Sequence, residues 1–525
     1  MSDANLQKRL ITALLDPRCY PHAVKSVRVI ETHISWILLA GEYAYKIKKA
    51  VDLGFLNYAD LASRRFCCEE EIRLNLRTSP NIYLDVVGIG GSVEQPVFGA
   101  LPSIEYAVKM HRFDADSLLD KLLMRDKLTA RHIDALASTI SRFHAASPCA
   151  TPDSTFGTPA TIHAEVLQNF EQMFGLLHDC ADLQDLATLQ RATDAVFDRL
   201  RTTFAIRREQ GFVRECHGDL HLGNIALIDD EPVLFDCIEF SPALRWIDVM
   251  DEIAFTMMDL LHRDQPQFAW RLLNAILEAS GDYAGVVVLR FYLAYRAAVR
   301  AKVCAIRHSQ SGITASAKAE ELQACRSYLD LARQCLAPQQ AALIITHGLP
   351  GSGKTTFSQY VIETMGAIRI RSDVERKRLF GVGVTQSSRE QGGDIYSNDA
   401  TQRTYSRLLE QAQQILQAGH IVIVDAAFLR HQERERFREL AHKLSVPFAI
   451  ASLYASDALL RQRLQQRRND ASEADVAVLE KLQQVQQPLS SAENAWSARF
   501  TTEQAPDSKA NAQNWNRLRR KLARP

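Results

Sequence analysis

Alternating hydrophobic and polar positions dominate the first part of the chain and predict a small sheet there. Segments near the N-terminus are rich in β-branched, aromatic and alternating residues, and Gly41-Glu42 is typical of a tight turn between two of them. The segment 62–76 instead repeats its apolar residues at helical spacing. The predicted strands are 27–31, 35–40, 43–48, 82–88 and 104–110. The pattern therefore predicts a mixed lobe of strands with one inserted helix.

Helical periodicity then continues to about residue 335. It is interrupted by a predicted hairpin, 225–228 with 233–236, which turns at 229–232. The predicted helical stretches are 117–144, 162–208, 246–262, 267–306 and a last one that ends near 335. This order predicts a helical lobe after the smaller mixed lobe.

The pattern changes again after residues 337–340, Ala-Pro-Gln-Gln, which form the best predicted domain boundary. From there, short apolar strands alternate with helices, as in a parallel α/β sheet. These strands are 341–346, 368–370, 420–424 and 448–453. The predicted division is 1–337 (lobes of about 25–112 and 113–337), 338–503 and a polar tail of 504–525.

Composition narrows the class of protein. A chain of 525 residues exceeds the usual size of one hydrophobic core, and 46% hydrophobic with 24% charged residues is ordinary for a globular protein. The 62 basic and 62 acidic residues cancel, which disfavours nucleic acid as a partner. The first residues carry no signal segment, and no apolar run reaches the roughly 18 residues that span a bilayer. We therefore expect a cytoplasmic protein without a membrane partner.

The first candidate site is His-Gly-Asp-Leu-His-Leu-Gly-Asn, residues 217–224, followed by a second aspartate, Asp236. Asp219 and Asn224 are five positions apart, and this spacing resembles that of kinase catalytic loops. In such loops the aspartate accepts the proton of the substrate hydroxyl, the asparagine holds Mg²⁺, and a further carboxylate reaches the metal. The resemblance implies Asp219 as the catalytic base and Asn224 and Asp236 as metal ligands.

A lysine for ATP is expected on a strand of the small lobe. Lys46 and Lys48 alternate onto one face of the strand 43–48, and the apolar residues before Lys46 favour it. Its expected partner is a helix glutamate, either Glu70 or Glu71, and the sequence leaves that choice open.

Three acidic residues, Asp248, Asp251 and Glu252, follow on a predicted helix. Acids in a first helical turn are favoured by the helix dipole, and we expect Asp248 to order the catalytic loop. An acidic pocket for a cationic substrate is the alternative.

The motifs HGDLHLGN and FDCIEF together resemble the aminoglycoside phosphotransferase and choline kinase branch of the kinase-like fold. The resemblance covers roughly residues 25–335 and implies a bilobal α+β domain that uses ATP and Mg²⁺. One feature departs from the protein kinases. No Gly-x-Gly-x-x-Gly loop precedes Lys46, where residues 32–34, Thr-His-Ile, make the turn.

The second candidate site is a complete P-loop, which fits G-x-x-x-x-G-K-[ST] at every fixed position. It follows an apolar strand and precedes a helix, the context that phosphate binding by backbone N–H groups requires. Lys354 is expected to reach the β- and γ-phosphates, and Thr355 to coordinate Mg²⁺. The residues expected to bind nucleotide are Gly348, Gly351, Ser352, Gly353, Lys354, Thr355 and Thr356.

Residues after the next strand supply a candidate acceptor site. The segment Asp-Val-Glu-Arg, 373–376, resembles the Asp-x-x-Arg of polynucleotide kinases and of the zeta-toxin group. This resemblance implies Asp373 as the base for a substrate hydroxyl and Arg376 as a contact of the transferring phosphoryl group. A solvated start of a helix is the alternative.

Two further groups complete this site. Asp425 ends an apolar strand, like a Walker B element, and is an expected Mg²⁺ ligand or substrate contact. Small P-loop kinases carry lid arginines that clamp ATP, and Arg467 or Arg468 is favoured for that role. Both belong to a basic cluster that begins with Arg461 and Arg463.

The whole chain resembles a bacterial family in which an aminoglycoside-phosphotransferase-like domain precedes a P-loop domain. The fold implied is an α+β kinase-like bilobal domain followed by an α/β P-loop domain with a parallel sheet. The function implied is phosphate transfer from ATP, with Mg²⁺, to small-molecule hydroxyls at two sites. The alternatives are a P-loop domain that regulates a single kinase domain, or one that phosphorylates nucleic-acid ends. The sequence names neither acceptor, nor an oligomeric state.

Overall fold

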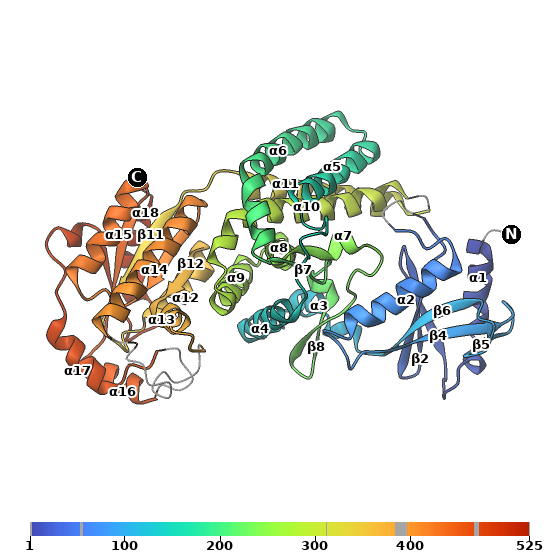
Figure 1. The fold of residues 1–525 in the computed structure, drawn as a ribbon, viewed down its shortest axis with the longest axis horizontal. Coiled ribbons are helices and arrows are strands. Elements are labelled where there is room, and N and C mark those ends of the chain that lie inside the picture. The colour runs from blue at the N-terminus through green and yellow to red at the C-terminus, as the bar shows by residue number, and fades with distance from the viewer. Residues whose placement is uncertain are drawn as a thin grey trace. The chain divides into compact units, whose positions relative to one another are not determined.

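The computed structural model describes residues 3–52, 56–310, 312–383, 395, 397–466 and 472–523 (Figure 1). Contacts divide the chain into two compact units. The first unit is Met1–Gln190, Asp194–Asp259 and Ala305–Ser311, and the second is Arg191–Thr193, Leu260–Cys304 and Gly312–Pro525. Contacts thus group residues 260–304 with the P-loop segment, whereas the sequence pattern groups them with the preceding helices. The predicted domain bounds stay a prediction.

The first unit opens with an antiparallel sheet in the strand order β1-β2-β3-β6-β4-β5. The first three strands have the predicted bounds, and Gly41 makes the tight turn before the third of them at φ 62°. The strands are β1 Val27–Glu31, β2 Ser35–Ala40, β3 Tyr43–Lys48, β4 Tyr83–Gly91, β5 Pro96–Phe98 and β6 Glu105–His111.

Two helices cover this sheet, and they explain where its lysines lie. Residues of α1 (Asp3–Ala13) share a core with Tyr45 and Ile47 of β3. Ala44, on the other face of β3, shares a core with Cys68 of α2 (Leu61–Asn75). Because side chains alternate along a strand, Lys46 and Lys48 lie on the α2 face.

The helical part of the first unit is broken more often than the sequence predicts. The stretch 162–208 divides at Asp179, whose carboxylate accepts from two N–H groups at the start of the next helix. The predicted hairpin turns at Asp229 and Asp230, both with positive φ, as in a two-residue type I′ turn. The elements are α3 Leu119–Met124, α4 Ala130–Ala146, α5 Pro159–Leu176, α6 Cys180–Glu209, β7 Val213–Glu215, β8 Ile225–Ile228, β9 Glu231–Leu234, α7 Pro242–Arg245, β10 Trp246–Asp248 and α8 Val249–His262.

The second unit contains the predicted parallel sheet, in the order β12-β13-β11-β14-β15. Helices precede it and connect its strands. The strands are β11 Ala342–His347, β12 Ile368–Arg371, β13 Ile421–Asp425, β14 Phe448–Tyr454 and β15 Ser497–Thr501. The helices are α9 Pro266–Ser280, α10 Val286–Ser309, α11 Ala315–Leu336, α12 Lys354–Met365, α13 Ser372–Leu379, α14 Asn398–Gln417, α15 His431–Lys443, α16 Asp457–Gln466, α17 Val476–Val485 and α18 Ala512–Leu522.

The predicted polar tail is part of this core. Helix α18 buries Trp515, Leu518 and Leu522 against the sheet, and Trp515 stacks on Phe357 of α12 with ring centroids 4.9 Å apart. β15, which the sequence pattern did not predict, pairs with β14 and leads into this helix. The tail prediction was wrong because the basic run occupies only the outer face of an amphipathic helix.

Among the described residues, no helix combines the length and apolar composition that a membrane crossing would need.

Candidate active sites

A row of alternating charges occupies the α2 face of β3. Lys46 Nζ lies 2.9 Å from Glu71 Oε1 and also pairs with Asp236. Lys48 Nζ lies 2.7 Å from Glu71 Oε2 and also pairs with Glu239. One carboxylate, Glu71, is thus shared by both lysines, with a further carboxylate at each end of the row.

The two ends of the row differ in exposure. The Asp236 side chain is 40% exposed, whereas the Lys48 side chain is fully buried and that of Glu239 is 5% exposed. Tyr58, also buried, donates its hydroxyl to Glu239. Only the Lys46–Asp236 end can therefore meet a ligand, which favours Lys46 over Lys48 as the candidate ATP lysine.

The charges of the row stabilise one another. Burial alone would raise the pKa of Glu71, but the ammonium groups of Lys46 and Lys48 lower it to about 2. Burial opposes the charge on each lysine, yet the neighbouring carboxylates hold the pKa of both well above the ordinary value. Glu71, Lys46 and Lys48 therefore stay charged near neutral pH.

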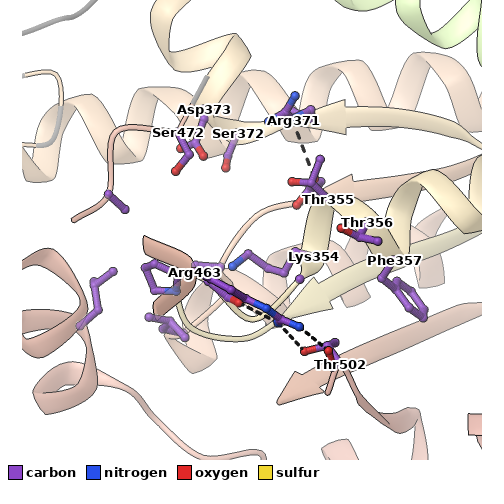
Figure 2. A pocket seen from close by; sticks show the side chains of 18 of the residues that line it. Lys354, Thr355, Thr356, Phe357, Arg371, Ser372, Asp373, Arg463, Ser472 and Thr502 are labelled. Atoms are coloured by element: carbon purple, nitrogen blue, oxygen red, sulfur yellow. Dashed lines mark hydrogen bonds and ion pairs between the residues drawn. The ribbon is translucent and has the colours of Figure 1, made fainter. Parts of the chain in front are cut away.

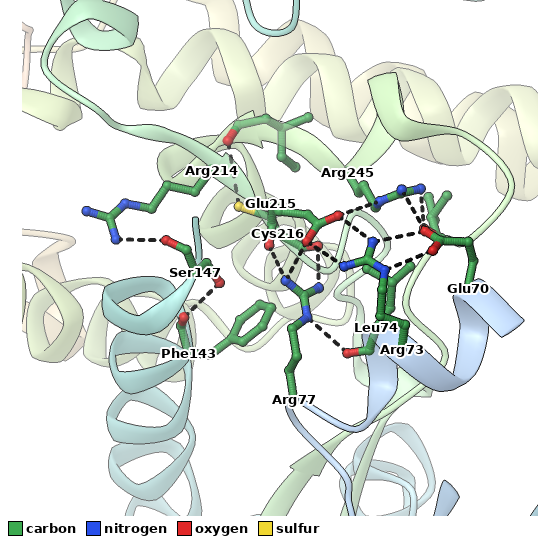
Figure 3. A network of polar contacts seen from close by, with 12 residues as sticks. Glu70, Arg73, Leu74, Arg77, Phe143, Ser147, Arg214, Glu215, Cys216 and Arg245 are labelled. Atoms are coloured by element: carbon green, nitrogen blue, oxygen red, sulfur yellow. Dashed lines mark hydrogen bonds and ion pairs between the residues drawn. The ribbon is translucent and has the colours of Figure 1, made fainter. Parts of the chain in front are cut away.

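Glu70, the other expected partner of Lys46, lies in a separate network (Figure 3). It accepts from Arg73 at 2.8 Å and from Arg245 at 3.1 Å. Both arginines also bind Glu215, which lies four residues before Asp219. The choice between the two glutamates is thus settled for Glu71, and Glu70 instead links α2 to the base of the candidate catalytic loop.

The candidate catalytic loop brings Asp219 and Asn224 together. The Asn224 amide donates to the Asp219 backbone carbonyl at 2.9 Å and to its carboxylate Oδ2 at 3.0 Å. Asn224 is buried, whereas the Asp219 side chain is 37% exposed. The loop therefore presents one accessible carboxylate, held by an amide that is itself fixed.

Three polar residues on one face of α8 hold this loop by its backbone. The Glu252 carboxylate accepts from Gly218 N at 2.7 Å, Asp259 accepts from Leu222 N at 3.0 Å, and Thr256 donates to Leu220 O at 2.6 Å. Their spacing of four and three residues places them on one side of an otherwise apolar helix. That spacing was a usable sequence signal.

The expectation that Asp248 orders the loop is wrong. Asp248 is buried and forms a two-bonded pair with Arg207 at 2.7 and 2.8 Å. Glu252 is also buried and receives a hydrogen bond from His144 at 3.0 Å. These engaged acids, with buried Asp251, do not form an open acidic pocket.

Asp236 sits in an unusual backbone conformation next to Lys46. Its φ is 66°, which is uncommon for a residue with a side chain and often marks a functional site. Its N–H donates to the Tyr83 hydroxyl at 3.2 Å, and the next N–H, of Cys237, donates to Asn75 Oδ1 at 3.0 Å. The side chains of β4 and α2 therefore hold the conformation that directs this carboxylate to Lys46.

The P-loop of the second unit has the geometry expected for phosphate binding. A Cβ on Gly348 would lie 2.6 Å from Ser352 Oγ, and Gly351 has φ 80°, so both positions require glycine. Lys354 Nζ donates to the carbonyls of Gly348 and Leu349 at 3.0 and 2.9 Å. Ser352 Oγ is buried and has no hydrogen-bond partner among the described residues. A bound phosphate oxygen would satisfy that hydroxyl.

A cavity of about 850 Å³ opens over this loop (Figure 2). Most of the predicted residues of the second site line it together, although they come from three different segments of the chain. From the predicted set, the lining contains Gly351, Gly353, Lys354, Thr355, Thr356, Asp373, Arg376 and Asp425. The cavity is large enough for a nucleotide and a small acceptor together.

Asp425 and Arg376 have defined contacts at this cavity. Asp425 is buried and accepts from Ser358 Oγ of α12 at 3.2 Å. Arg376 donates to the Ile395 carbonyl at 2.9 Å and to Thr401 Oγ1 at 3.3 Å. The hydroxyl of Thr355 and the carboxylate of Asp425 are hard oxygen donors, which suit Mg²⁺, and Asn224 with Asp236 offers oxygen donors in the first unit.

The predicted lid arginines, Arg467 and Arg468, lie outside the described residues. Their neighbour Arg463 lines the cavity and donates to the Gly351 carbonyl at 3.1 Å and to Thr502 Oγ1 at 3.0 Å. It thereby fixes the P-loop to the segment after β15 (Figure 2). Arg463 belongs to the basic cluster noted in the sequence, but spacing alone did not single it out.

Comparison with known proteins places two family models on the chain. Residues 103–286 match the model described as the phosphotransferase enzyme family, and residues 343–489 match that of an AAA domain. An uncharacterized protein of Mycobacterium tuberculosis, Rv2004c, is 30% identical over 450 residues, which cover 83% of this chain and 86% of the relative.

Two solved structures, each named as a kinase, resemble parts of the chain. A choline kinase from Cryptosporidium parvum is 10% identical and covers 62% of this chain and 94% of its own, with a TM-score of 0.40. A gluconokinase from Sinorhizobium meliloti is 17% identical and covers 35% of this chain and 91% of its own, with a TM-score of 0.25.

Proposed function

We propose that this chain, which belongs to a bacterial family with an aminoglycoside-phosphotransferase-like domain followed by a P-loop kinase domain, transfers the γ-phosphate of Mg-ATP at two sites. The family makes the chain a phosphotransferase. Beyond that, we propose that ATP is the phosphate donor, that both sites are active, and that each site has an acceptor. We propose small-molecule hydroxyls as acceptors, and the word aminoglycoside in the family name is not taken as the substrate.

The first proposed site is carried by the row Asp236–Lys46–Glu71. Lys46 would hold phosphate oxygens, and Glu71, 2.9 Å away, fixes its ammonium group. Asn224 and Asp236 would hold Mg²⁺. Asp219, the exposed carboxylate of the loop, would accept the proton of the acceptor hydroxyl as phosphate is transferred.

The second proposed site is carried by the P-loop and α13. The N–H groups at the start of α12 and the Ser352 hydroxyl would bind phosphate oxygens, and Lys354 would exchange its carbonyl partners for them. Thr355 and Asp425 would hold Mg²⁺. Asp373 would take the proton of the second acceptor, Arg376 would contact the transferring phosphoryl group, and Arg467 or Arg468 would clamp the bound ATP.

Mg-ATP would supply the phosphoryl group, and its Mg²⁺ would neutralise charge on the phosphates, so the residues of the chain would act chiefly by position and electrostatics. The observation that carries the proposal is the shared Glu71. Glu71 is buried and binds two lysines. It thereby fixes Lys46, the lysine that also faces the exposed carboxylate of Asp236. A fixed lysine beside an exposed carboxylate suits the binding of phosphate and metal.

The test is transfer of labelled γ-phosphate from Mg-ATP into an extract of cytosolic metabolites. Wild type is compared with Asp219→Asn and Lys354→Ala, and mass spectrometry identifies the labelled products. We expect two products, each lost in one variant only. If no product forms with wild type, the proposal fails.

One other outcome would separate the proposed function from its main alternative. If Lys354→Ala changes the Asp219-dependent product and no product depends on Lys354 alone, the P-loop domain regulates the first site and is not itself a kinase.

A further inference from the structure

The edge of the P-loop sheet is completed by a helix from outside the P-loop sequence family. Helix α9 lies within residues 103–286, which match the phosphotransferase family model, yet its contacts place it in the second unit. The strand it meets, β12, is the outermost strand of the parallel sheet. An edge strand leaves backbone groups unpaired on its outer side, and these need partners.

Asn274 of α9 provides such partners. Its amide donates to the Ala367 carbonyl at 3.0 Å, and its oxygen accepts from Arg369 N at 2.7 Å. Asn274 is buried, as is Arg369, so these bonds are shielded from water. The side chain thus continues the hydrogen bonding of the sheet and fixes the position of β12.

One turn later, Glu278 binds two arginines of β12. Its carboxylate lies 3.0 Å from Arg369 Nη2 and 2.8 Å from Arg371 Nη1. The two arginines are two positions apart and so project from the same face of the strand. All three side chains are at most 17% exposed, so little water competes for these ion pairs.

Arg371 also faces the candidate metal ligand of the P-loop site. It lines the cavity (Figure 2), and its Nε lies 4.0 Å from Asp425 Oδ2. The two residues are directly opposite in the register of β12 and β13. A modest movement of the guanidinium would bring it into hydrogen-bond contact with that carboxylate and occupy an oxygen that Mg²⁺ needs.

We propose that Glu278 is a positioning residue of the P-loop site, which holds Arg371 back from Asp425 and keeps that carboxylate available to Mg²⁺. This role rests on the proposed function of the second site. It also means that the P-loop site depends on a helix that precedes the P-loop sequence by about seventy residues.

The test is the Mg²⁺ dependence of nucleotide binding to the full chain. Binding of a fluorescent ATP analogue is titrated with Mg²⁺, and the signal that Lys354→Ala removes is assigned to the P-loop site. In Glu278→Gln, Arg371 turns to Asp425, and we expect the half-saturating Mg²⁺ concentration to rise about tenfold, equivalent to about 1.4 kcal/mol. In Glu278→Gln/Arg371→Gln the competitor is gone, and the concentration returns to within about threefold of wild type.

A matched control separates this role from mere stabilisation. Arg271 of α9 pairs with Glu363 of α12 at 2.6 Å, so Arg271→Gln breaks a different ion pair of the same helix. We expect Arg271→Gln, and Arg371→Gln alone, to keep the wild-type Mg²⁺ requirement.

The results that would overturn the role of Glu278 differ from those that would overturn the proposed function. An unchanged Mg²⁺ requirement in Glu278→Gln, or a double variant as impaired as Glu278→Gln, would overturn the positioning role while leaving the P-loop site intact. Wild type that binds no nucleotide in a Mg²⁺-dependent manner would overturn the proposed function itself, and the role of Glu278 with it.

Discussion

Lys48 is buried, faces no open site and still lies between two carboxylates, so its removal should affect stability more than activity. In Lys48→Met, Glu71 keeps Lys46 as a partner, but Glu239 loses its ammonium group in a position that water does not reach. Removal of one partner of a buried ion pair costs about 3–5 kcal/mol. A domain has roughly 5–15 kcal/mol of stability in total, so the loss should be large but measurable.

The assay is hydrogen exchange of the backbone N–H groups of β3 and α2, followed by mass spectrometry. A loss of about 3 kcal/mol should make exchange in this strand and this helix more than a hundredfold faster. Lys49→Met is the matched control, because Lys49 pairs with Glu31, whose side chain is 61% exposed. A pair of that kind is worth about 0–1 kcal/mol.

A double variant tests the cause. Lys48→Met/Glu239→Gln removes the charge that Lys48 leaves behind, so it should exchange more slowly than Lys48→Met. Two results would refute the argument that Lys48 offsets a buried charge. One is that Lys48→Met exchanges as slowly as Lys49→Met. The other is that the double variant exchanges as fast as Lys48→Met.

Two further predictions follow from groups described above. The pKa of Glu71 is about 2 in the fold against 4.5 ordinarily, so Glu71 contributes about 3 kcal/mol above pH 4.5, and this is lost as the pH falls toward 2. Urea unfolding of Glu71→Gln should lack that acid-dependent loss, and an unchanged pH profile would contradict it. Trp515→Ala empties part of the P-loop core and should lower the free energy of unfolding by about 3–5 kcal/mol, measured by denaturant titration, whereas a loss below about 1 kcal/mol would place α18 outside the core.

The sequence predicted elements well where the local pattern decided them. β1, β2 and β3 are rich in β-branched and aromatic residues, and the P-loop is a contiguous motif, so both could be found without tertiary information. The choice between Glu70 and Glu71 could not be made in this way, because adjacent helix residues point about 100° apart and only the position of the sheet decides which one faces Lys46.

Other residues depend on contacts between distant segments. Glu278 and Arg371 are 93 positions apart, and no local pattern links them. Asp248 and Glu252 are both acids near a helix start, so the sequence could not show which of them meets the catalytic loop, and the choice of Asp248 was wrong. Only the path of the loop shows which acid it meets. The apolar spacing of Trp515, Leu518 and Leu522 was visible in the sequence, but the basic residues between them obscured it.

The polar character of the α9 surface has a consequence for synthesis of the chain on the ribosome. Asn274 is made 95 residues before its partner Arg369, which at about 5–20 residues per second is a delay of about 5–20 s. During that interval β12 does not yet exist, and the helix face that will receive it carries Asn274 and Glu278 in water. Because this helix face carries hydrated amide and carboxylate groups and not apolar side chains alone, the nascent chain exposes less apolar surface that could aggregate.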